Sequence, residues 1–146
     1  NNRSEEVIGS AADLWVAHHH GAYGDGPRRS RDRVTEPAPA LLNPSLQADP
    51  RPPFLAWLML LEECEGSLSS VRCDEPHYKV FDEFRGASYA LRYQILCERL
   101  VERQLYSAAA LELSVAKSKT HRALSPATSI RNLFSEFAGR ILAAQG

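Results

Sequence analysis

Histidines and cysteines are the residues of this chain that most often hold metal ions, but their spacing does not favour a site. The three consecutive histidines at 18–20 lie in a segment with helical periodicity, where neighbouring side chains point in different directions and cannot converge on one ion. Cys64 and Cys73 have no C-x-x-C pair between them, and only His77 is near them in the sequence. A zinc site would need two ligands beyond these cysteines. We therefore favour helix-end histidines, which suit the helix dipole, and structural thiols.

Nucleophiles and phosphate-binding loops are not indicated either. Ser67, Ser88 and Ser114 do not lie in a G-x-S-x-G context, so the sequence does not support a serine hydrolase. The glycine-rich stretch 21–26 follows a predicted helix, whereas a phosphate-cradling loop follows a strand and opens a helix. We interpret this stretch as a flexible turn.

Adjacent acidic residues could hold magnesium in principle. Such pairs include Glu5 with Glu6, Glu62 with Glu63, and Asp82 with Glu83. The first pair is explained by the positive end of a helix dipole, and the second ends a predicted strand, where solvation is the favoured interpretation. An Asp followed by a (D/E)-x-K sequence is not found after an apolar strand. The sequence thus predicts no catalytic and no metal-ligating residue in this chain.

Basic residues gather in three places where they could contact phosphates. These are Arg3, the cluster Arg28, Arg29, Arg31 and Arg33, and the group Lys117, Lys119 and Arg122. The formal net charge is −1, so the whole molecule is not attracted to nucleic acid and any DNA contact has to be local. Charge alone favours exposed basic loops that bind nothing.

The elements that would position these residues follow from the apolar spacing. Helices are expected at 4–20, 88–104 and 128–144, strands at 54–61 and 106–113, and a basic turn at 117–122. The first strand reads as buried on both faces, and a short helix is the alternative for the second. The order helix, long loop, strand, helix, strand, helix predicts an α/β fold. The sheet looks incomplete, because two strands do not make a stable sheet.

Apolar stripes predict which helix faces are buried. They are Val7, Ala11, Leu14, Trp15 and His18 in the first helix, Tyr89, Tyr93, Leu96, Leu100 and Val101 in the second, and Ile130, Leu133, Phe134, Phe137 and Ile141 in the last. The region 21–53 between the first helix and the first strand holds seven of the nine prolines and has no periodicity. We expect a long loop there, and an irregular stretch at 71–80.

Length and composition limit the possible classes of protein. The chain has 146 residues, of which 44% are hydrophobic, which suits one domain or part of one. Three cysteines are too few and odd for a disulfide framework and predict a reducing cytoplasm. The longest apolar run, 54–61, is too short to span a bilayer, so no membrane association is expected. The first residue is Asn1 and helix-capping residues follow at once, which we interpret as a cut end.

Several stretches resemble, in order, XhoI-type restriction endonucleases. They are NNRSEE at 1–6, GSAADLW at 9–15, WLMLLEEC at 57–64, EPHY at 75–78 with VF at 80–81 and EF at 83–84, and SYA at 88–90 through RY at 92–93, LC at 96–97, LV at 100–101 and LY at 105–106. The resemblance covers nearly the whole chain except the loop at roughly 27–53. It identifies the chain as the C-terminal portion, 1–146, of such an endonuclease domain, with 21–53 as a Pro/Arg-rich loop.

The resemblance implies a PD-(D/E)XK nuclease with an incomplete restriction-endonuclease-like core here. Such an enzyme is a homodimer that cleaves palindromic duplex DNA of the CTCGAG kind by magnesium-assisted hydrolysis. Its Asp and (D/E)-x-K strand would precede Asn1, so this chain itself is expected to be inactive.

The resemblance implies that this part of the enzyme supports the DNA site. Asn2 and Arg3, at the start of a helix beside the catalytic strand, are candidates for contact with phosphate or metal-bound water. Helix capping and a surface ion pair explain the same two residues equally well. Arg28, Arg29 and Arg31 are further candidates for DNA binding. The alternatives for the whole chain are a truncated, non-catalytic DNA-binding or interaction remnant and an unrelated helical regulator.

Overall fold

The computed structural model describes residues 2–19, 52–72 and 82–145, and divides the chain into two units, Asn1–Pro53 and Phe54–Gly146. In the first unit a single helix is described, α1 (Asn2–His19). It begins two residues before the predicted start. Glu5 lies in its first turn and His18 and His19 in its last, where the helix dipole favours each charge. The indole of Trp15 contacts the imidazoles of His18 and His19, with ring centroids 5.9 Å apart in both cases.

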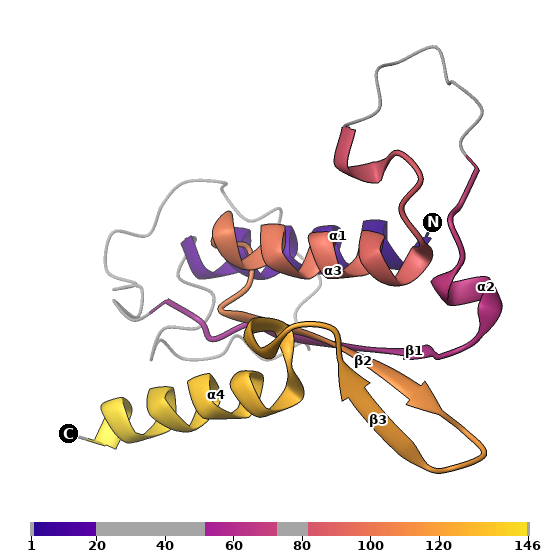
Figure 1. Ribbon diagram of the computed structural model, residues 1–146. Helices are drawn as coiled ribbons and strands as arrows, with labels where there is room; N and C mark the ends of the chain where they lie inside the picture. Colours follow the sequence, from indigo (N-terminus) through magenta and orange to yellow (C-terminus); the bar gives the residue numbers. More distant parts are fainter. Residues whose placement is uncertain (1, 20–51, 73–81, 146) are drawn as a thin grey trace, which may run out of the picture. The chain divides into compact units, whose positions relative to one another are not determined.

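The second unit is an α/β structure with a three-stranded mixed sheet (Figure 1). Its described elements are β1 (Ala56–Glu62), α2 (Glu65–Leu68), the 3-10 turn η1 (Asp82–Phe84), α3 (Tyr89–Glu102), β2 (Ala108–Val115), β3 (Thr120–Ala123), the 3-10 turn η2 (Pro126–Thr128) and α4 (Ile130–Gln145). Strand β2 pairs in parallel with β1 and antiparallel with β3. The α/β class predicted from the sequence is confirmed, and so are both predicted strands, with shifted ends.

The two faces of the sheet are covered by different helices (Figure 1). On one face α3 packs Tyr93 and Cys97 against Ala109 and Leu111, with Trp57, Met59 and Leu61 of β1 beside them. On the other face Leu133 of α4 packs against Ala108 and Ala110, with Phe54 next to them. Strand β2 therefore has helices on both faces and strands on both edges, and its residues 108–113 are all buried.

Strand β1 differs from the prediction that it is buried on both faces. Its burial alternates, and Leu58 and Leu60 are 40% and 64% exposed. The register pairs Leu58 with Ala110, so these leucines lie on the face that α4 covers over β2. Helix α4 does not extend over β1 far enough to bury them. The strand buried on both faces is β2, whose alanines gave a weaker apolar signal.

Helix α3 confirms the predicted helix at 88–104, with Ser88 as the N-cap whose hydroxyl accepts from the Leu91 amide (3.2 Å). Its predicted stripe is only partly right. Tyr93 and Leu100 are buried, but Tyr89 and Val101 lie at its margin and are 46% and 39% exposed. The remaining buried positions are Ala90, Gln94 and Cys97. The small and polar side chains among them are what the apolar count missed.

Helix α4 exists where the sequence predicts a helix, but its predicted buried face is wrong. Leu133 is buried, whereas Phe134, Phe137 and Ile141 are 56%, 43% and 43% exposed. The helix contacts the sheet through its first turns and then leaves it (Figure 1). The apolar stripe is real in the sequence, yet the described residues place no protein over most of it. Phe137 does contact Phe54, with ring centroids 5.4 Å apart.

The turn predicted at 117–122 is half wrong, because Thr120–Ala123 forms strand β3. Its residues Thr120, His121 and Arg122 are polar and exposed, so no apolar alternation marks the strand in the sequence. The loop at 21–53 falls almost entirely outside the described residues, as does most of the irregular stretch at 71–80. Among the described residues, no helix is long and apolar enough to cross a membrane.

The burial pattern predicts how two leucines differ in their contribution to stability. Leu111 of β2 is fully buried against α3, so Leu111→Ala is expected to lower the free energy of unfolding by about 2–5 kcal/mol. Leu60→Ala makes the same chemical change at an exposed site of β1 and should change it by less than about 0.5 kcal/mol. Urea denaturation followed by circular dichroism measures both. Equal losses would show that the assignment of the two faces is wrong.

Candidate functional site

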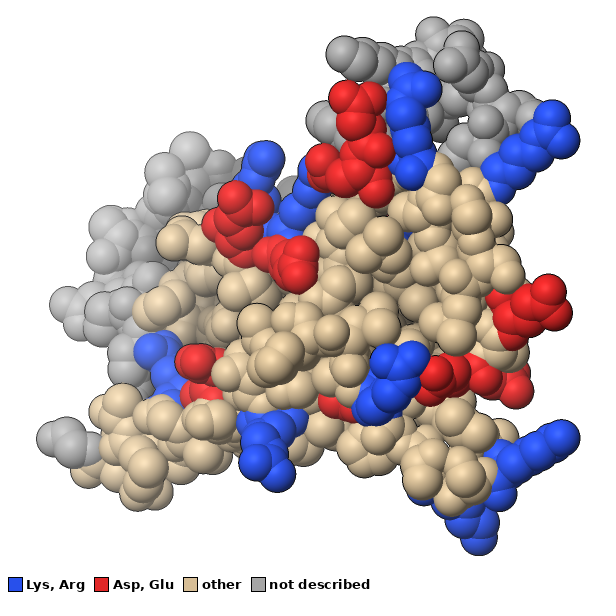
Figure 2. Space-filling view, in the orientation of Figure 1, with Lys and Arg blue, Asp and Glu red and all other residues tan. Residues whose placement is uncertain are grey.

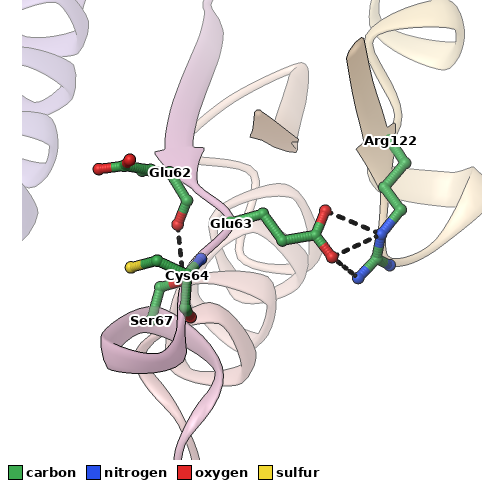
Figure 3. A network of polar contacts seen from close by, with 5 residues as sticks. All are labelled: Glu62, Glu63, Cys64, Ser67 and Arg122. Atoms are coloured by element: carbon green, nitrogen blue, oxygen red, sulfur yellow. Dashed lines mark hydrogen bonds and ion pairs between the residues drawn. The ribbon is translucent and has the colours of Figure 1, made fainter. Parts of the chain in front are cut away.

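The carboxyl end of β1 brings several polar groups together (Figure 3). The chain turns there from Glu62 into α2, and Ser67 of that short helix folds back toward the strand. Its hydroxyl donates to the carbonyl of Glu62 (2.6 Å) and accepts from the amide of Cys64 (3.1 Å). Ser67 is only 6% exposed. This hydroxyl therefore fixes the turn after β1.

Glu63 forms an ion pair with Arg122 of β3, across the end of the sheet (Figure 3). The Arg122 Nε lies 3.1 Å from both carboxylate oxygens, and the Nη2 donates to one of them. The hydrogen bond to Glu63 raises the pKa of Arg122. One of the two acids at this strand end is thus neutralised by a guanidinium, and one of the basic residues predicted for phosphate contact is engaged with it.

A buried carboxylate lies further back, in the middle of β2. Glu112 is 2% exposed, and its two oxygens have different partners. One accepts from the backbone amide of Ile130 at the start of α4 (2.7 Å), and the other is 2.9 Å from Nδ1 of His121 on β3. A carboxylate oxygen accepts, so Nδ1 is the donor. Glu112 therefore caps α4 and holds β3 with a single side chain.

The remaining acidic pair is also occupied by basic side chains. Asp82 pairs with Arg85 at 3.2 Å, and Glu83 pairs with Arg99 of α3, whose guanidinium also lies over the ring of Phe84. In the ranges 2–19, 52–72 and 82–145, no three His, Cys, Asp or Glu side chains lie close enough to hold a metal ion. Of the acids that the sequence analysis singled out, Glu63, Asp82 and Glu83 form ion pairs with arginines. Sequence spacing does not show the pairs Glu63–Arg122 and Glu83–Arg99, because the partners are far apart along the chain.

The residues predicted to support a DNA site are only partly described. Arg3 is exposed on α1 and pairs with Glu6 at 3.3 Å, which is the surface ion pair weighed as the alternative. Asn2 is the first residue of α1, and its side chain lies outside the description. Arg28, Arg29 and Arg31 fall outside the described residues. A role for these residues in DNA binding stays a prediction.

The cysteines differ sharply in their surroundings. Cys97 is fully buried between α3 and the sheet, and burial raises the pKa of its thiol to about 12. Cys64 is exposed at the start of α2. Cys73 falls outside the described residues. Because the thiolate is the reactive form, Cys97 is a core residue and not a nucleophile.

The contacts of Glu112 predict a large cost for its removal. Glu112→Ala leaves the Ile130 amide without its acceptor and should lower the free energy of unfolding by about 2–3 kcal/mol. Glu112→Gln keeps one acceptor oxygen and should cost less. Glu136→Ala makes the same change at an exposed position of α4 and serves as the control. A loss no larger for Glu112→Ala than for the control in urea denaturation would contradict the capping role.

The surroundings of the thiols predict that Cys64 is modified selectively and that Cys97 is protected at pH 8 and at pH 9. In a Cys73→Ser variant, Ellman's reagent should modify only Cys64 in the native protein at pH 8, and both thiols after addition of guanidinium chloride. With a pKa of about 12, roughly one Cys97 thiol in 10⁴ is ionised at pH 8, and the sheet also shields it. Raising the pH to 9 should leave Cys97 unmodified. Rapid native modification of both thiols would show that α3 does not cover the sheet.

Comparisons with known proteins place these features in a family. The family model for restriction endonuclease XhoI matches residues 39–125, more than half of the chain. The type II restriction enzyme BstVI of Geobacillus stearothermophilus is 37% identical over 114 residues, which are 78% of this chain and 40% of that enzyme. The type II restriction enzyme XhoI of Xanthomonas vasicola is 40% identical over 101 residues, 69% of this chain and 31% of that enzyme.

A third relative, the type II restriction enzyme AbrI of Azospirillum brasilense, is 34% identical over 79 residues, 54% of this chain and 25% of that enzyme. No solved structure matches the chain. The chain spans at most about two fifths of the length of these curated relatives. The family match includes all three strands of the sheet, β1, β2 and β3, and helix α3, which packs on it. This chain belongs to the XhoI restriction endonuclease family.

Proposed function

We propose that this chain is part of a type II site-specific deoxyribonuclease that cleaves palindromic duplex DNA of the CTCGAG kind. The observation that carries the proposal is the family match over residues 39–125, together with relatives that are type II restriction enzymes. A homodimer suits a palindromic site, because a two-fold protein presents the same surface to both half-sites. We place the enzyme in the cytoplasm, where its substrate lies.

Magnesium is the cofactor that the family implies, but the described residues do not fit it. Glu63, Asp82 and Glu83 are paired with arginines, and Glu112 is bonded to a backbone amide and a histidine. Hard cations such as magnesium need carboxylates that converge on one point. In the part of the chain that the structure describes, no such cluster exists. We therefore assign no step of the hydrolysis to these residues.

The described sheet instead supports a scaffold role within that enzyme. Strand β1 pairs with β2 along one edge, and no other described strand pairs with its second edge. Leu58 and Leu60 of the same strand are exposed. A long apolar edge strand in water invites aggregation, so proteins usually cover or pair it. This agrees with the proposal that a strand bearing the Asp and (D/E)-x-K residues, expected before Asn1, adjoins this region.

Cleavage of a plasmid with one CTCGAG site tests the proposal. A product that includes the upstream coding sequence should cut the plasmid once in the presence of magnesium. The 146-residue chain alone should not cut it, because its described residues include no cluster of acids that could hold magnesium. Site-specific cutting by the 146-residue chain would contradict the missing metal ligands.

The coding sequence upstream of this chain distinguishes the nuclease hypothesis from that of a non-catalytic remnant. A continuous frame with an Asp and a (D/E)-x-K strand close before Asn1 supports the nuclease. An in-frame stop there, with no cleavage by the longest product, would support the alternative of a non-catalytic DNA-binding or interaction remnant.

A further inference from the structure

The hairpin of β2 and β3 ends in a basic turn, residues 116–119, which we call the hairpin tip. It carries Lys117 and Lys119, both exposed. No acidic residue occurs in the sequence from 113 to 135, although the whole chain is slightly acidic. Figure 2 shows positively charged side chains projecting into solvent at the lower right, where the hairpin ends in Figure 1. The positive charge here is local, as a DNA contact on this chain would require.

The cations of the hairpin divide into two groups. At its base, Arg122 is paired with Glu63, and His121 is bonded to the buried Glu112. At the tip, neither Lys117 nor Lys119 has an ion-pair partner among the described residues. The base cations hold the hairpin against the sheet and the tip cations remain available.

The tip is held in one conformation by its own hydrogen bonds. Ser118 Oγ lies 3.4 Å from the carbonyl of Val115 and 2.6 Å from the hydroxyl of Thr120. Lys119 has a positive φ of 54°, which closes the turn before β3 begins. Because the backbone is already ordered, a ligand that binds the lysines pays little entropy to fix the turn. The structure thus presents two exposed ammonium groups at the end of a short hairpin.

We propose that the hairpin tip binds the phosphate backbone of duplex DNA through Lys117 and Lys119. The proposal rests on the proposed function, because duplex DNA is chosen as the polyanionic ligand on the ground that the enzyme is a nuclease. A two-stranded antiparallel ribbon is narrow enough to lie along a groove of DNA with its turn against the backbone. Lysine binds phosphate as a point charge and reads no bases. The tip therefore adds affinity and fixes orientation, while sequence is read elsewhere.

Fluorescence anisotropy with labelled duplexes and the full 146-residue chain tests this directly. Lys117→Ala with Lys119→Ala should weaken binding on the order of tenfold at low salt. The slope of log affinity against log salt concentration should fall by about two, one for each lost phosphate contact. The loss should be equal on duplexes with and without a CTCGAG site. Lys117→Arg with Lys119→Arg should keep most of the binding.

Two further variants exclude trivial explanations. Arg103→Ala with Arg131→Ala removes the same charge from exposed positions at the end of α3 and in α4, and should change affinity less than about twofold. Lys119→Gly removes one tip charge where φ is positive, a conformation that glycine adopts freely. This variant should lose part of the binding while its Tm is unchanged or raised. A loss of DNA binding by this variant could then not be explained by a loss of folding.

Three outcomes would overturn the proposal. They are equal affinity and slope for the lysine variants and the arginine control, a loss confined to CTCGAG duplexes, and no duplex binding by the unchanged chain at 50 mM salt. Each is independent of the cleavage test. If a longer product cuts DNA but the lysine variants bind normally, the proposal for the hairpin tip is wrong and the proposed nuclease function stands. If binding depends on the lysines but no longer product cuts DNA, the proposal for the hairpin tip stands and the proposed nuclease function is wrong.

Discussion

The burial of β2 is the constraint on which the second unit depends. Residues 108–113 of this strand are buried, so each face needs a covering layer and each edge a paired strand. Helices α3 and α4 supply the layers, and β1 and β3 supply the edges. Three consecutive alanines, 108–110, begin the strand, and their small side chains let both helices approach closely. Every other described element of the unit is held directly or indirectly through this strand.

Placing a carboxylate in such a strand imposes a second condition. Glu112 is buried, and an unsatisfied carboxylate in that position would be strongly destabilising. Its two oxygens are satisfied by the Ile130 amide and by His121, which fixes where α4 starts and where β3 runs. A similar buried chain connects α3 to η2, where Thr128 donates to Gln94 (2.8 Å) and Gln94 donates to Glu98 (2.7 Å). These buried polar contacts thus join β2 to α4 and to β3, and α3 to η2.

What the sequence could predict depended on whether its signal was local. Helix α3 was predictable because Ser88 is a local cap and the positions of Tyr93 and Leu100 follow one helix face. Strand β3 was not, because its residues 120–122 carry no apolar alternation. Its side-chain partners are Glu112 on β2 and Glu63 just after β1, which are distant in the sequence. The burial of α4 was mispredicted for a related reason. A stripe shows which face is apolar, and only the neighbouring elements decide whether Phe134 or Phe137 is covered.

The candidate site shows that functional residues, like strands, are hard to predict from local sequence alone. Adjacent acids such as Glu62 and Glu63 look alike in the sequence, yet one of them is bound by a guanidinium that lies 59 positions further along the chain. Likewise Lys117, Lys119 and Arg122 form one basic group in the sequence, and the structure separates them by their partners. Charged side chains that already form ion pairs within the protein are poor candidates for binding a ligand, because binding would first have to break the ion pair. Charges that the fold holds in place but leaves unpaired are the better candidates, and in the hairpin these are the two lysines at its tip.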